Sequence, residues 1–517
     1  MARLKEYNGH YCESEYEYAF IGFLEAEGWK YSSGNNIYRV TKRDVLIADD
    51  FKKFIADTNL DLTEDEVIQI YDNVRLVGAE SDFATLHKVY GWMVNGVQFT
   101  PQDGLPRMIP LIEFDNWDKN IFRVVNQFTV EYTNNGQKEN RRPDVLLFVN
   151  GIPLCVIELK NPADANATIY DAWEQINIRY WRDIPHLLHY CPLACISDGV
   201  KTRLGTVRTP YEHFYAWRRV NEGDVVSTLP FAETETMIKG VYTPERFVEI
   251  FRDYIYFQDS IYDCDEVEIV CRYPQFFAAK LLKQSIVNSV VTRSGKGGTY
   301  FGATGCGKTY TMAFLARQLA LRCTDIPEIG SPTIILIVDR DELQKQGSKL
   351  FTKSKEFLNL GEVSVVKNRT QLRQELVARQ SGGFYICTIQ KFCDREDDKI
   401  GLINDRQNII CFSDEAHRTQ LEHSKKIQFS KDADENMKAM VSKPYAKVLK
   451  EAFPHATFVG FTGTPIAETY QTFGDEIDRY TMDQAVADGL TVSIKYHPRI
   501  AKVLLDNKKV KEIPLQY

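Results

Sequence analysis

The sequence predicts an α/β protein made of two units of different character. Up to about residue 255, helical segments such as 14–27 are mixed with two short apolar strands around Val145 and Val156, a pattern typical of an α+β unit. From Thr299 onward, β-branched runs alternate with helical stretches, which is the rhythm of a parallel, doubly wound sheet. With 517 residues, 44% of them apolar, the chain is long enough to bury more than one core.

The composition excludes several classes of protein. A charged content of 26% together with the apolar content excludes a disordered tail, a collagen-like repeat and a disulfide mini-scaffold. A net charge of -8 argues against a surface that binds polyanions everywhere, but it leaves room for a local basic channel. The 11 cysteines form no facing CxxC pairs, and no apolar run approaches the roughly 20 residues that span a bilayer. We therefore expect a cytoplasmic protein that does not engage a membrane.

A hairpin in the first unit carries charged residues at the ends of apolar strands. Pro143 and Asp144 open the strand VLLFV, an Asn-Gly pair makes a turn, and the returning strand ends in Glu158 and Lys160. Residues two apart on a strand share a face, so Glu158 and Lys160 point the same way. A carboxylate on each strand can bind Mg²⁺, while the lysine orients an attacking water. Because charged strand ends are common, an ordinary structural role for these residues stays open.

The pairing register of this hairpin decides whether its two carboxylates can cooperate. A two-residue turn at Asn150 and Gly151 sets Asp144 opposite Ile157 and sends Glu158 to the other face. A three-residue loop or a β-bulge shifts the pairing by one residue and brings Asp144 onto the Glu158 face. We predict the shifted pairing, because only that geometry can form a shared metal site.

Charged residues elsewhere in the first unit could join the same site. Glu15 and Glu17 lie on the predicted helix ESEYEYAFIGFLEAEGW, where either could supply a further acidic group or be ordinary helix charge. Arg141 and Arg142 precede the first carboxylate of the hairpin and could meet nucleic-acid phosphates or remain solvated.

The second unit opens with a complete phosphate-binding motif, GATGCGKT at 302–309, between a strand-like TYF and a helical YTMAFLARQLA. The strand–loop–helix context makes the motif specific. Its glycines let backbone N–H groups curl toward the phosphates of a nucleotide, aided by the helix N-terminus. They are Gly302, Gly305 and Gly307. Lys308 would neutralise the β and γ oxygens, and Thr309 would hold Mg²⁺.

Two later motifs each follow an apolar strand. The motif DEAH follows the strand NIICFS, and its first two residues are Asp414 and Glu415. Both carboxylates therefore lie at the strand end where open α/β sheets hold ligands. The first would coordinate Mg²⁺ and the second would orient the attacking water. TGTP follows FVGF at 462–465. The three motifs together resemble the superfamily 2 helicases and translocases of the DEAD/H-box type, over about residues 260–470.

That resemblance adds two expectations. The loop at Thr462–Thr464 would couple the nucleotide state to the grip on nucleic acid. Arg272, Tyr273 and Gln275 stand where relatives carry adenine-contacting residues, and a glutamine amide can read the edges of adenine. An exposed helix start is the alternative for this short segment.

The order of all the motifs resembles the restriction (R) subunit of Type I restriction-modification enzymes: PD, ExK, a Gln/Tyr helix and a DEAH motor in one chain. The resemblance implies a PD-(D/E)xK nuclease at 1–258, a RecA-like doubly wound motor lobe of the superfamily 2 type at 259–472, and a linker with the incomplete beginning of a second motor lobe at 473–517. It implies catalytic roles for Asp144, Glu158, Lys160, Gln175, Tyr180 and Glu415. It implies that ATP is held by Gln275, Gly302, Gly305, Gly307, Lys308, Thr309 and Asp414, and that Mg²⁺ is held by Asp144, Glu158, Thr309 and Asp414.

The same resemblance implies an activity and partners. ATP-driven translocation along double-stranded DNA would be coupled to Mg²⁺-dependent cleavage of unmodified DNA away from the recognition site. The partners would be DNA and the methylation and specificity subunits, with S-adenosylmethionine used only through those subunits. The alternative is a free-standing DEAH-type DNA helicase or translocase whose degenerate nuclease domain acts as a binding module.

Two departures from the family are visible. Relatives space the Gln and Tyr as QxxxY, whereas four residues separate Gln175 from Tyr180 here and Arg179 stands at the expected Tyr position, so one of the pair could be misassigned. After Pro465, a short polar helix and a strand LTVSIKYHPRI are predicted, and no second lobe with its arginine motif follows. We therefore expect this polypeptide alone to bind ATP and to translocate poorly or not at all.

Overall fold

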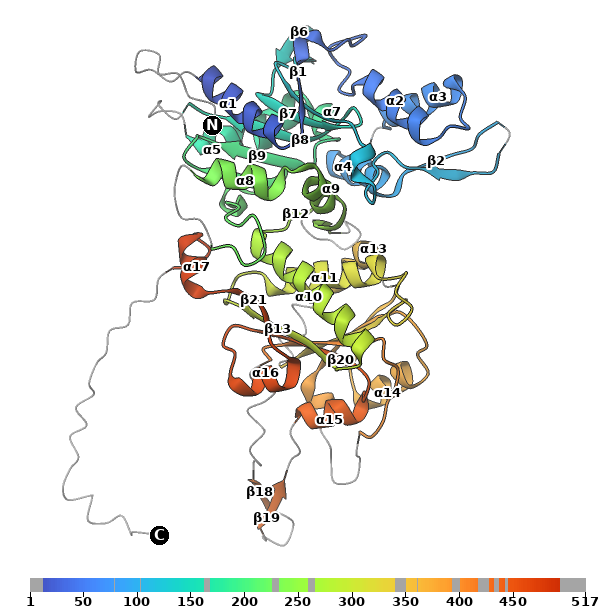
Figure 1. Cartoon of the computed structure of the whole chain (residues 1–517), viewed down its shortest axis with the longest axis vertical. Helices are drawn as coiled ribbons and strands as arrows, with labels where there is room; N and C mark the ends of the chain where they lie inside the picture. The colour runs from blue at the N-terminus through green and yellow to red at the C-terminus, as the bar shows by residue number, and fades with distance from the viewer. Residues whose placement is uncertain are drawn as a thin grey trace, which may run out of the picture.

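The computed structural model shows two units stacked along the long axis of the molecule (Figure 1). It describes residues 13–78, 80–102, 104–161, 168–225, 232–258, 266–339, 350–359, 361–392, 400–416, 427–431, 437–441 and 445–492. The N-terminal residues, coloured blue to green, form the upper unit, and the yellow to red residues form the lower one.

A six-stranded mixed sheet is the core of the first unit. Its order is β1 (Lys30–Ser33), β4 (Phe122–Asn126), β7 (Val145–Val149), β8 (Ile152–Leu159), β9 (Leu193–Ser197) and β10 (Thr202–Thr206). β1 pairs with β4 and β8 with β9 in parallel, while the other neighbours are antiparallel. Every residue of β7 and β8 is buried, as expected for apolar strands covered on both faces. The predicted α+β unit with its strand pair is therefore confirmed.

Helices surround this sheet. α1 (Glu13–Ala26) contacts β1, β4 and β8, α5 (Ile169–Glu174) contacts β8 and β9, and α8 (Glu233–Val241) contacts β10. A helical group of α2 (Ala48–Thr58), α3 (Glu64–Arg75) and α4 (Asp82–Asn95) precedes the short hairpin of β2 (Val97–Phe99) and β3 (Arg107–Ile109). A second hairpin, β5 (Val130–Asn134) and β6 (Gln137–Arg141), leads into β7. α9 (Pro244–Asp253) is the last helix of the unit.

The second unit contains a seven-stranded, wholly parallel sheet. Its order is β15 (Val363–Val365), β16 (Phe384–Thr388), β14 (Thr333–Val338), β17 (Ile409–Asp414), β20 (Thr457–Thr462), β13 (Lys296–Gly302) and β21 (Glu476–Tyr480). The β-branched runs predicted from Thr299 onward form six of these strands, so the predicted doubly wound parallel sheet is confirmed. Its helices include α10 (Tyr273–Thr292), α11 (Lys308–Arg322), α14 (Arg369–Val377), α15 (Tyr445–Ala452), α16 (Ala467–Phe473) and α17 (Met482–Ala487).

The strand β21 was not predicted from the sequence. It is a polar edge strand, EIDRY, and only its last residue is buried, so it lacks the apolar run that identified the other strands. It lies beyond residue 472 and pairs in parallel with β13, so the parallel sheet of the second unit extends past the predicted boundary. The unit boundaries themselves stay predictions. The strand predicted at 490–500 falls outside the described residues from residue 493 onward.

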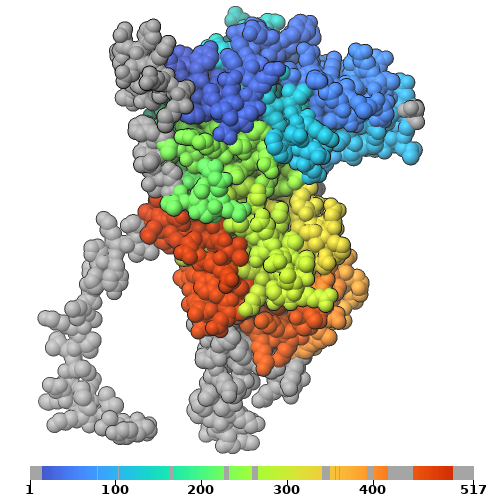
Figure 2. Space-filling model, in the orientation of Figure 1, coloured from blue at the N-terminus to red at the C-terminus, as the bar shows by residue number. Residues whose placement is uncertain are grey.

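The two units share one continuous apolar cluster, which runs from the first helix to α17. The segment between them includes β11 (Ile255–Phe257), which pairs with β12 (Glu268–Val270), and residues 259–265 lie outside the described residues. In the space-filling view the green surface of the first unit lies directly against yellow-green and red surface of the second (Figure 2). None of the described helices is long and apolar enough to cross a membrane.

Candidate active sites

The hairpin of β7 and β8 has the shifted register that a shared carboxylate site requires. Asn150 and Gly151 both have positive φ, 52° and 75°, and close a two-residue turn that pairs Val149 with Ile152. Between Phe148 and Leu147 the register shifts by one residue, so that Leu147 faces Cys155 and Leu154 is the extra residue of a β-bulge. The predicted shift is confirmed, and the bulge rather than a longer loop produces it.

The bulge brings the two predicted carboxylates together. Asp144 N donates to Glu158 Oε1 at 3.4 Å, and Leu159 N donates to Asp144 Oδ2 at 2.8 Å. Lys160 Nζ lies 4.0 Å from Glu158 Oε2, on the same side of β8. The hairpin therefore gathers two carboxylates and one ammonium group at the end of a buried strand.

The chemistry of this donor set fits a divalent cation. Glu158 is 0% exposed, and its Oε2 accepts no hydrogen bond from the described residues. A buried carboxylate oxygen without a donor is costly unless a cation satisfies it. No group of three or more His, Cys, Asp or Glu side chains in the described part of the chain could hold a metal. Two carboxylates still suffice for Mg²⁺, which usually keeps several waters.

Burial dominates the electrostatics of Glu158. It raises the pKa of this carboxyl well above the ordinary value, and the nearby Asp144 carboxylate raises that pKa further. The Lys160 ammonium and the Tyr180 hydroxyl oppose the shift, because both stabilise the ionised form. Since a metal ligand must be ionised, cation binding at this position will compete with a proton.

A π-helical turn explains the unusual spacing of Gln175 and Tyr180. Residues Gln175–Tyr180 form a π-helix, in which residues five apart lie on one face. Gln175 Nε2 donates to Tyr180 Oη at 2.8 Å, and Tyr180 Oη donates to Glu158 Oε1 at 2.5 Å. Lys160 Nζ donates to Gln175 Oε1 at 3.0 Å. The structure therefore brings both predicted residues to the hairpin.

Arg179, which stands at the family's usual Tyr position, points elsewhere. It forms an ion pair with Glu174 at 2.6 Å, and its side chain is half exposed. The extra residue in the helix is thus absorbed by a local widening of the turn, and the Gln–Tyr pair keeps its contact.

Of the two acidic residues on α1, Glu17 lies beside the hairpin site. It is buried, and Asn126 Nδ2 donates to its Oε1 at 2.6 Å. Burial raises the pKa of Glu17, the Asn126 bond opposes the rise, and the Asp144 charge adds to it. Glu15 is partly exposed two residues earlier on the helix, which points it in a different direction.

The two arginines before Asp144 have different environments. Arg141 forms an ion pair with the buried Asp183 at 2.6 Å, which ties the β5–β6 hairpin to the helix after the π turn. Arg142 is exposed, and its charge lowers the pKa of Glu17, which places it near the acidic site. Sequence reasoning missed Asn126 and Asp183, since each acts across the fold and no local motif contains it.

The phosphate-binding motif forms the predicted loop between β13 and α11. Gly305 and Gly307 have φ of 84° and 85°, in the region that favours glycine. A Cβ on Gly307 would lie 2.5 Å from Gln275 Nε2, so a side chain there would collide. Lys308 Nζ donates to Gly302 O at 3.3 Å, and Thr309 lies in the first turn of α11.

The two later motifs converge on this loop because β17, β20 and β13 are neighbours in the parallel sheet. Glu415 Oε1 lies 3.8 Å from Lys308 Nζ. Burial raises the pKa of Asp414 to about 6, with Lys308 opposing the rise and Glu415 adding to it. A Cβ on Gly463 would be 3.4 Å from Gly302 O, so the TGTP loop lies against the phosphate loop. His417 of the DEAH motif lies outside the described residues.

Gln275 connects the phosphate loop to the residue before α10. Its Oε1 accepts from Arg272 N at 2.9 Å, and its Nε2 donates to Cys306 O and Gly307 O at 3.4 Å. A cavity of about 480 Å³ borders this point, lined among others by Gly305, Gly307, Gln275, Tyr310 and Tyr215 of the first unit. The cavity places aromatic and amide groups beside the phosphate loop, where a nucleoside base would sit.

The fold and the two sites define a protein that joins a nuclease-type α/β unit to a parallel-sheet ATPase lobe. Comparison with known proteins identifies both parts. A model described as Type I restriction enzyme R protein N terminus matches residues 11–213, and one described as SWI2/SNF2 ATPase matches residues 274–515. The chain belongs to the family of Type I restriction enzyme R proteins.

Curated relatives agree with this assignment. The chain is 30% identical over 522 residues to the Type I restriction enzyme HindI endonuclease subunit of Haemophilus influenzae, covering 96% of this chain and 47% of that protein. It is 29% identical over 526 residues to the putative type I restriction enzyme MjaIXP endonuclease subunit of Methanocaldococcus jannaschii, covering 95% of this chain and 46% of that protein. The chain thus spans about half the length of these relatives.

Proposed function

We propose that this chain is the nuclease and first motor region of an R protein that couples ATP-driven translocation on double-stranded DNA to Mg²⁺-dependent cleavage of unmodified DNA away from the recognition site. The observation that carries the proposal is the bulged hairpin, which holds Asp144, Glu158 and Lys160 together with one buried carboxylate oxygen unsatisfied. A degenerate nuclease would have no need to keep that costly arrangement. This favours the nuclease reading over the alternative of a helicase with an inert accessory domain.

In the proposed nuclease reaction, Asp144 and Glu158 would hold Mg²⁺. Bound Mg²⁺ supplies an activated water and polarises the scissile phosphate. Tyr180 donates to Glu158 Oε1 and so leaves Oε2 directed to the cation. Gln175 fixes the Lys160 ammonium, which stabilises the negative charge that develops on the phosphate.

In the proposed motor reaction, N–H groups of the phosphate loop and Lys308 bind the β and γ phosphates of ATP. Thr309 and Asp414 would hold the Mg²⁺ that accompanies the nucleotide. Glu415 orients the attacking water, since phosphoryl transfer depends mainly on positioning and charge stabilisation. The TGTP loop lies on the phosphate loop, where it can respond to the presence of the γ-phosphate.

The proposed partners are DNA and the methylation and specificity subunits, because the relatives are named as endonuclease subunits of Type I enzymes. Exposed Arg142 beside the acidic site is a candidate for contact with a DNA phosphate. Recognition of the DNA sequence is assigned to the partner subunits.

The test compares two lysine variants of an R protein that contains this region at full length, in complex with its methylation and specificity subunits. Lys160→Ala should lower Mg²⁺-dependent cleavage of an unmodified plasmid by about 10²–10⁴-fold and leave ATP binding unchanged. Lys308→Ala should abolish ATP binding and, with it, ATP-dependent cleavage. Exposed Lys53, which pairs with Asp57 on α2, gives the matched control Lys53→Ala. Cleavage that survives Lys160→Ala would reject the nuclease assignment.

A further inference from the structure

One face of α11, the helix that begins at the phosphate loop, lies against the end of the first unit. Tyr310 packs on Tyr256 with ring centroids 5.8 Å apart, and Phe314 packs on Tyr254 at 5.5 Å. Four residues separate Tyr310 from Phe314, so both lie on one side of the helix. The next positions on that side, Arg317, Gln318 and Arg322, continue the contact with residues 252–254.

An ion pair fastens the far end of this helix. Arg322 Nη2 lies 2.8 Å from Asp253 Oδ1, and its Nε lies 3.0 Å from the same oxygen. Asp253 is the last residue of α9 and is 3% exposed. Burial alone would raise the pKa of this carboxyl, but the Arg322 guanidinium, aided by Arg252 and Arg317, holds the pKa below its ordinary value. The carboxylate therefore stays ionised and paired.

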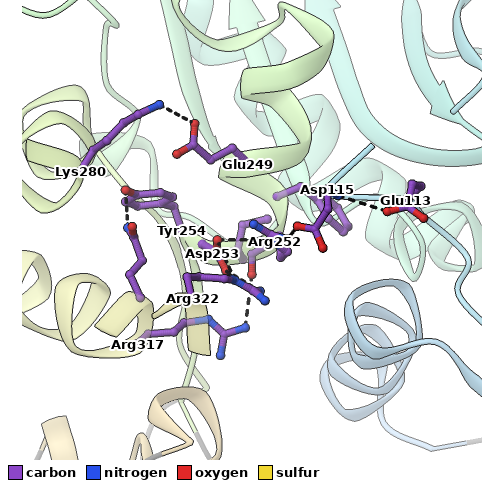
Figure 3. A network of polar contacts seen from close by, with 12 residues as sticks. Glu113, Asp115, Glu249, Arg252, Asp253, Tyr254, Lys280, Arg317 and Arg322 are labelled. Carbon is purple, nitrogen blue, oxygen red and sulfur yellow. Dashed lines mark hydrogen bonds and ion pairs between the residues drawn. The ribbon is translucent and has the colours of Figure 1, made fainter. Parts of the chain in front are cut away.

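Two polar contacts complete the junction, which Figure 3 shows at close range. Arg317 Nη2 donates to Arg252 O at 3.3 Å, and Gln318 Nε2 donates to the Tyr254 hydroxyl. On α10, the neighbouring helix, Lys280 pairs with Glu249 of α9 at 3.0 Å. The two motor helices are thus attached to α9 through separate ion pairs, of which only the Asp253 pair reaches the phosphate-loop helix.

We propose that Asp253 is a positioning residue for the phosphate loop, acting through Arg322. This inference rests on the proposed function, because it assumes that ATP binds at the loop. The 15 residues of α11 form a rod about 22 Å long, so a contact that fixes its end also fixes the N–H groups that point at the phosphates. A shift of about 1 Å in such groups can cost 10²-fold in a reaction.

Linkage makes this coupling reciprocal. If the Asp253 pair strengthens nucleotide binding by a given factor, bound nucleotide strengthens the docking of α9 on the motor by the same factor. The first unit, which carries the hairpin site, therefore helps to hold the phosphate loop of the nucleotide site in position.

The experiment measures the Kd of ATP and of inorganic tripolyphosphate with the full chain. Asp253→Asn should weaken both by about 10-fold, in the usual range for coupled sites, because the loop contacts the phosphates and not the base. The matched control is Glu249→Gln, which removes the ion pair to α10 and should leave both Kd values at the wild-type level. Equal weakening by both variants would show only a general loss of docking and would overturn the proposal.

Further variants secure the interpretation. If Asp253→Asn does not fold, Arg322→Lys replaces it as the test, because Arg322 is the more exposed partner of the pair. This variant keeps the positive charge but loses the contact through two nitrogens, so it should also weaken the binding of ATP and tripolyphosphate. Asp253→Asn and Arg322→Lys together should weaken binding less than the sum of their separate effects. If Lys308→Ala abolishes binding while Asp253→Asn binds as wild type, the inference fails and the proposed function stands. If Lys308→Ala itself binds ATP normally, the proposed function fails.

Discussion

The two acidic sites of this chain use the same groups and are built in different ways. Each combines two carboxylates and one lysine: Asp144, Glu158 and Lys160 in the first unit, and Asp414, Glu415 and Lys308 in the second. The lysine nitrogen lies 4.0 Å from a glutamate oxygen in the first site and 3.8 Å in the second. The burial differs, because the Glu158 side chain is 0% exposed and the Glu415 side chain 26%.

The assembly of the two sites differs as well. In the second unit the carboxylates are consecutive and follow one strand of a parallel sheet, so no pairing register has to be correct for them to meet. In the first unit they stand on two antiparallel strands and meet only because Leu154 bulges. The contiguous site needs no particular pairing register, whereas the bulged site depends on a single residue of register.

The largest effects on cleavage and on ATP hydrolysis should come from removing one carboxylate charge at each site. Glu158→Gln should lower Mg²⁺-dependent cleavage by about 10³-fold, and Asp414→Asn should lower ATP hydrolysis by a similar factor, because each loses a proposed metal ligand. Glu158→Gln should leave ATP binding intact. Plasmid cleavage and phosphate release, measured on the same preparations, check both effects.

The stability of Glu158→Gln should also differ from wild type in a way that depends on pH. The pKa of Glu158 is raised in the folded state, so its contribution to folding stability is present at low pH and is lost as pH rises through the folded pKa. The variant has no such loss, and its Tm minus that of wild type should increase from pH 5 to pH 8. A difference that shrinks over this range would contradict the burial of an ionisable carboxyl at this position.

The same contrast explains what the sequence could predict. Six of the seven strands in the parallel sheet were predictable one by one, because apolar β-branched runs with helices between them have one common architecture. The phosphate loop and DEAH motif were predictable because their residues are contiguous. The hairpin site could be predicted only conditionally, since the sequence identifies Asp144 and Glu158 as candidates and leaves the bulge undetermined.

What the sequence could not predict depends on contacts between distant segments. β21 has no apolar run, and it is held by pairing with β13. Asn126 supports Glu17 across 109 residues of chain. The π turn at Gln175–Tyr180 has no local sequence signature, so the sequence alone does not show that both residues of the unusual spacing reach the same site.

A smaller effect is expected from the pH dependence of the motor site. The pKa of Asp414 is raised to about 6, and the residue must be ionised to hold Mg²⁺. ATP hydrolysis should therefore be constant above pH 7 and fall below pH 6, by up to about tenfold per pH unit. Raising the Mg²⁺ concentration should move this fall in ATP hydrolysis to lower pH, because Mg²⁺ and a proton compete for the Asp414 carboxylate. If the pH at which ATP hydrolysis falls does not depend on Mg²⁺, a group other than Asp414 causes the fall.

The smallest effect is expected from deleting Ile178, which lies half exposed within the π turn. The deletion restores the family's QxxxY spacing, so the turn should become α-helical and keep Gln175 beside Tyr180. Cleavage should change by less than about threefold, because the contact to Glu158 is retained. Plasmid cleavage in the complex with its partner subunits is the measurement.

Tyr180→Phe is the matched comparison for this deletion. It keeps the ring and removes the hydroxyl that donates to Glu158 Oε1, so the pKa of that carboxyl should rise further and Mg²⁺ affinity should fall by about 10–100-fold. If the deletion of Ile178 is as damaging as Tyr180→Phe, the π turn is required for the contact itself. If only Tyr180→Phe is damaging, the π turn is a tolerated insertion, and the hydroxyl is what the bulged site needs from this helix.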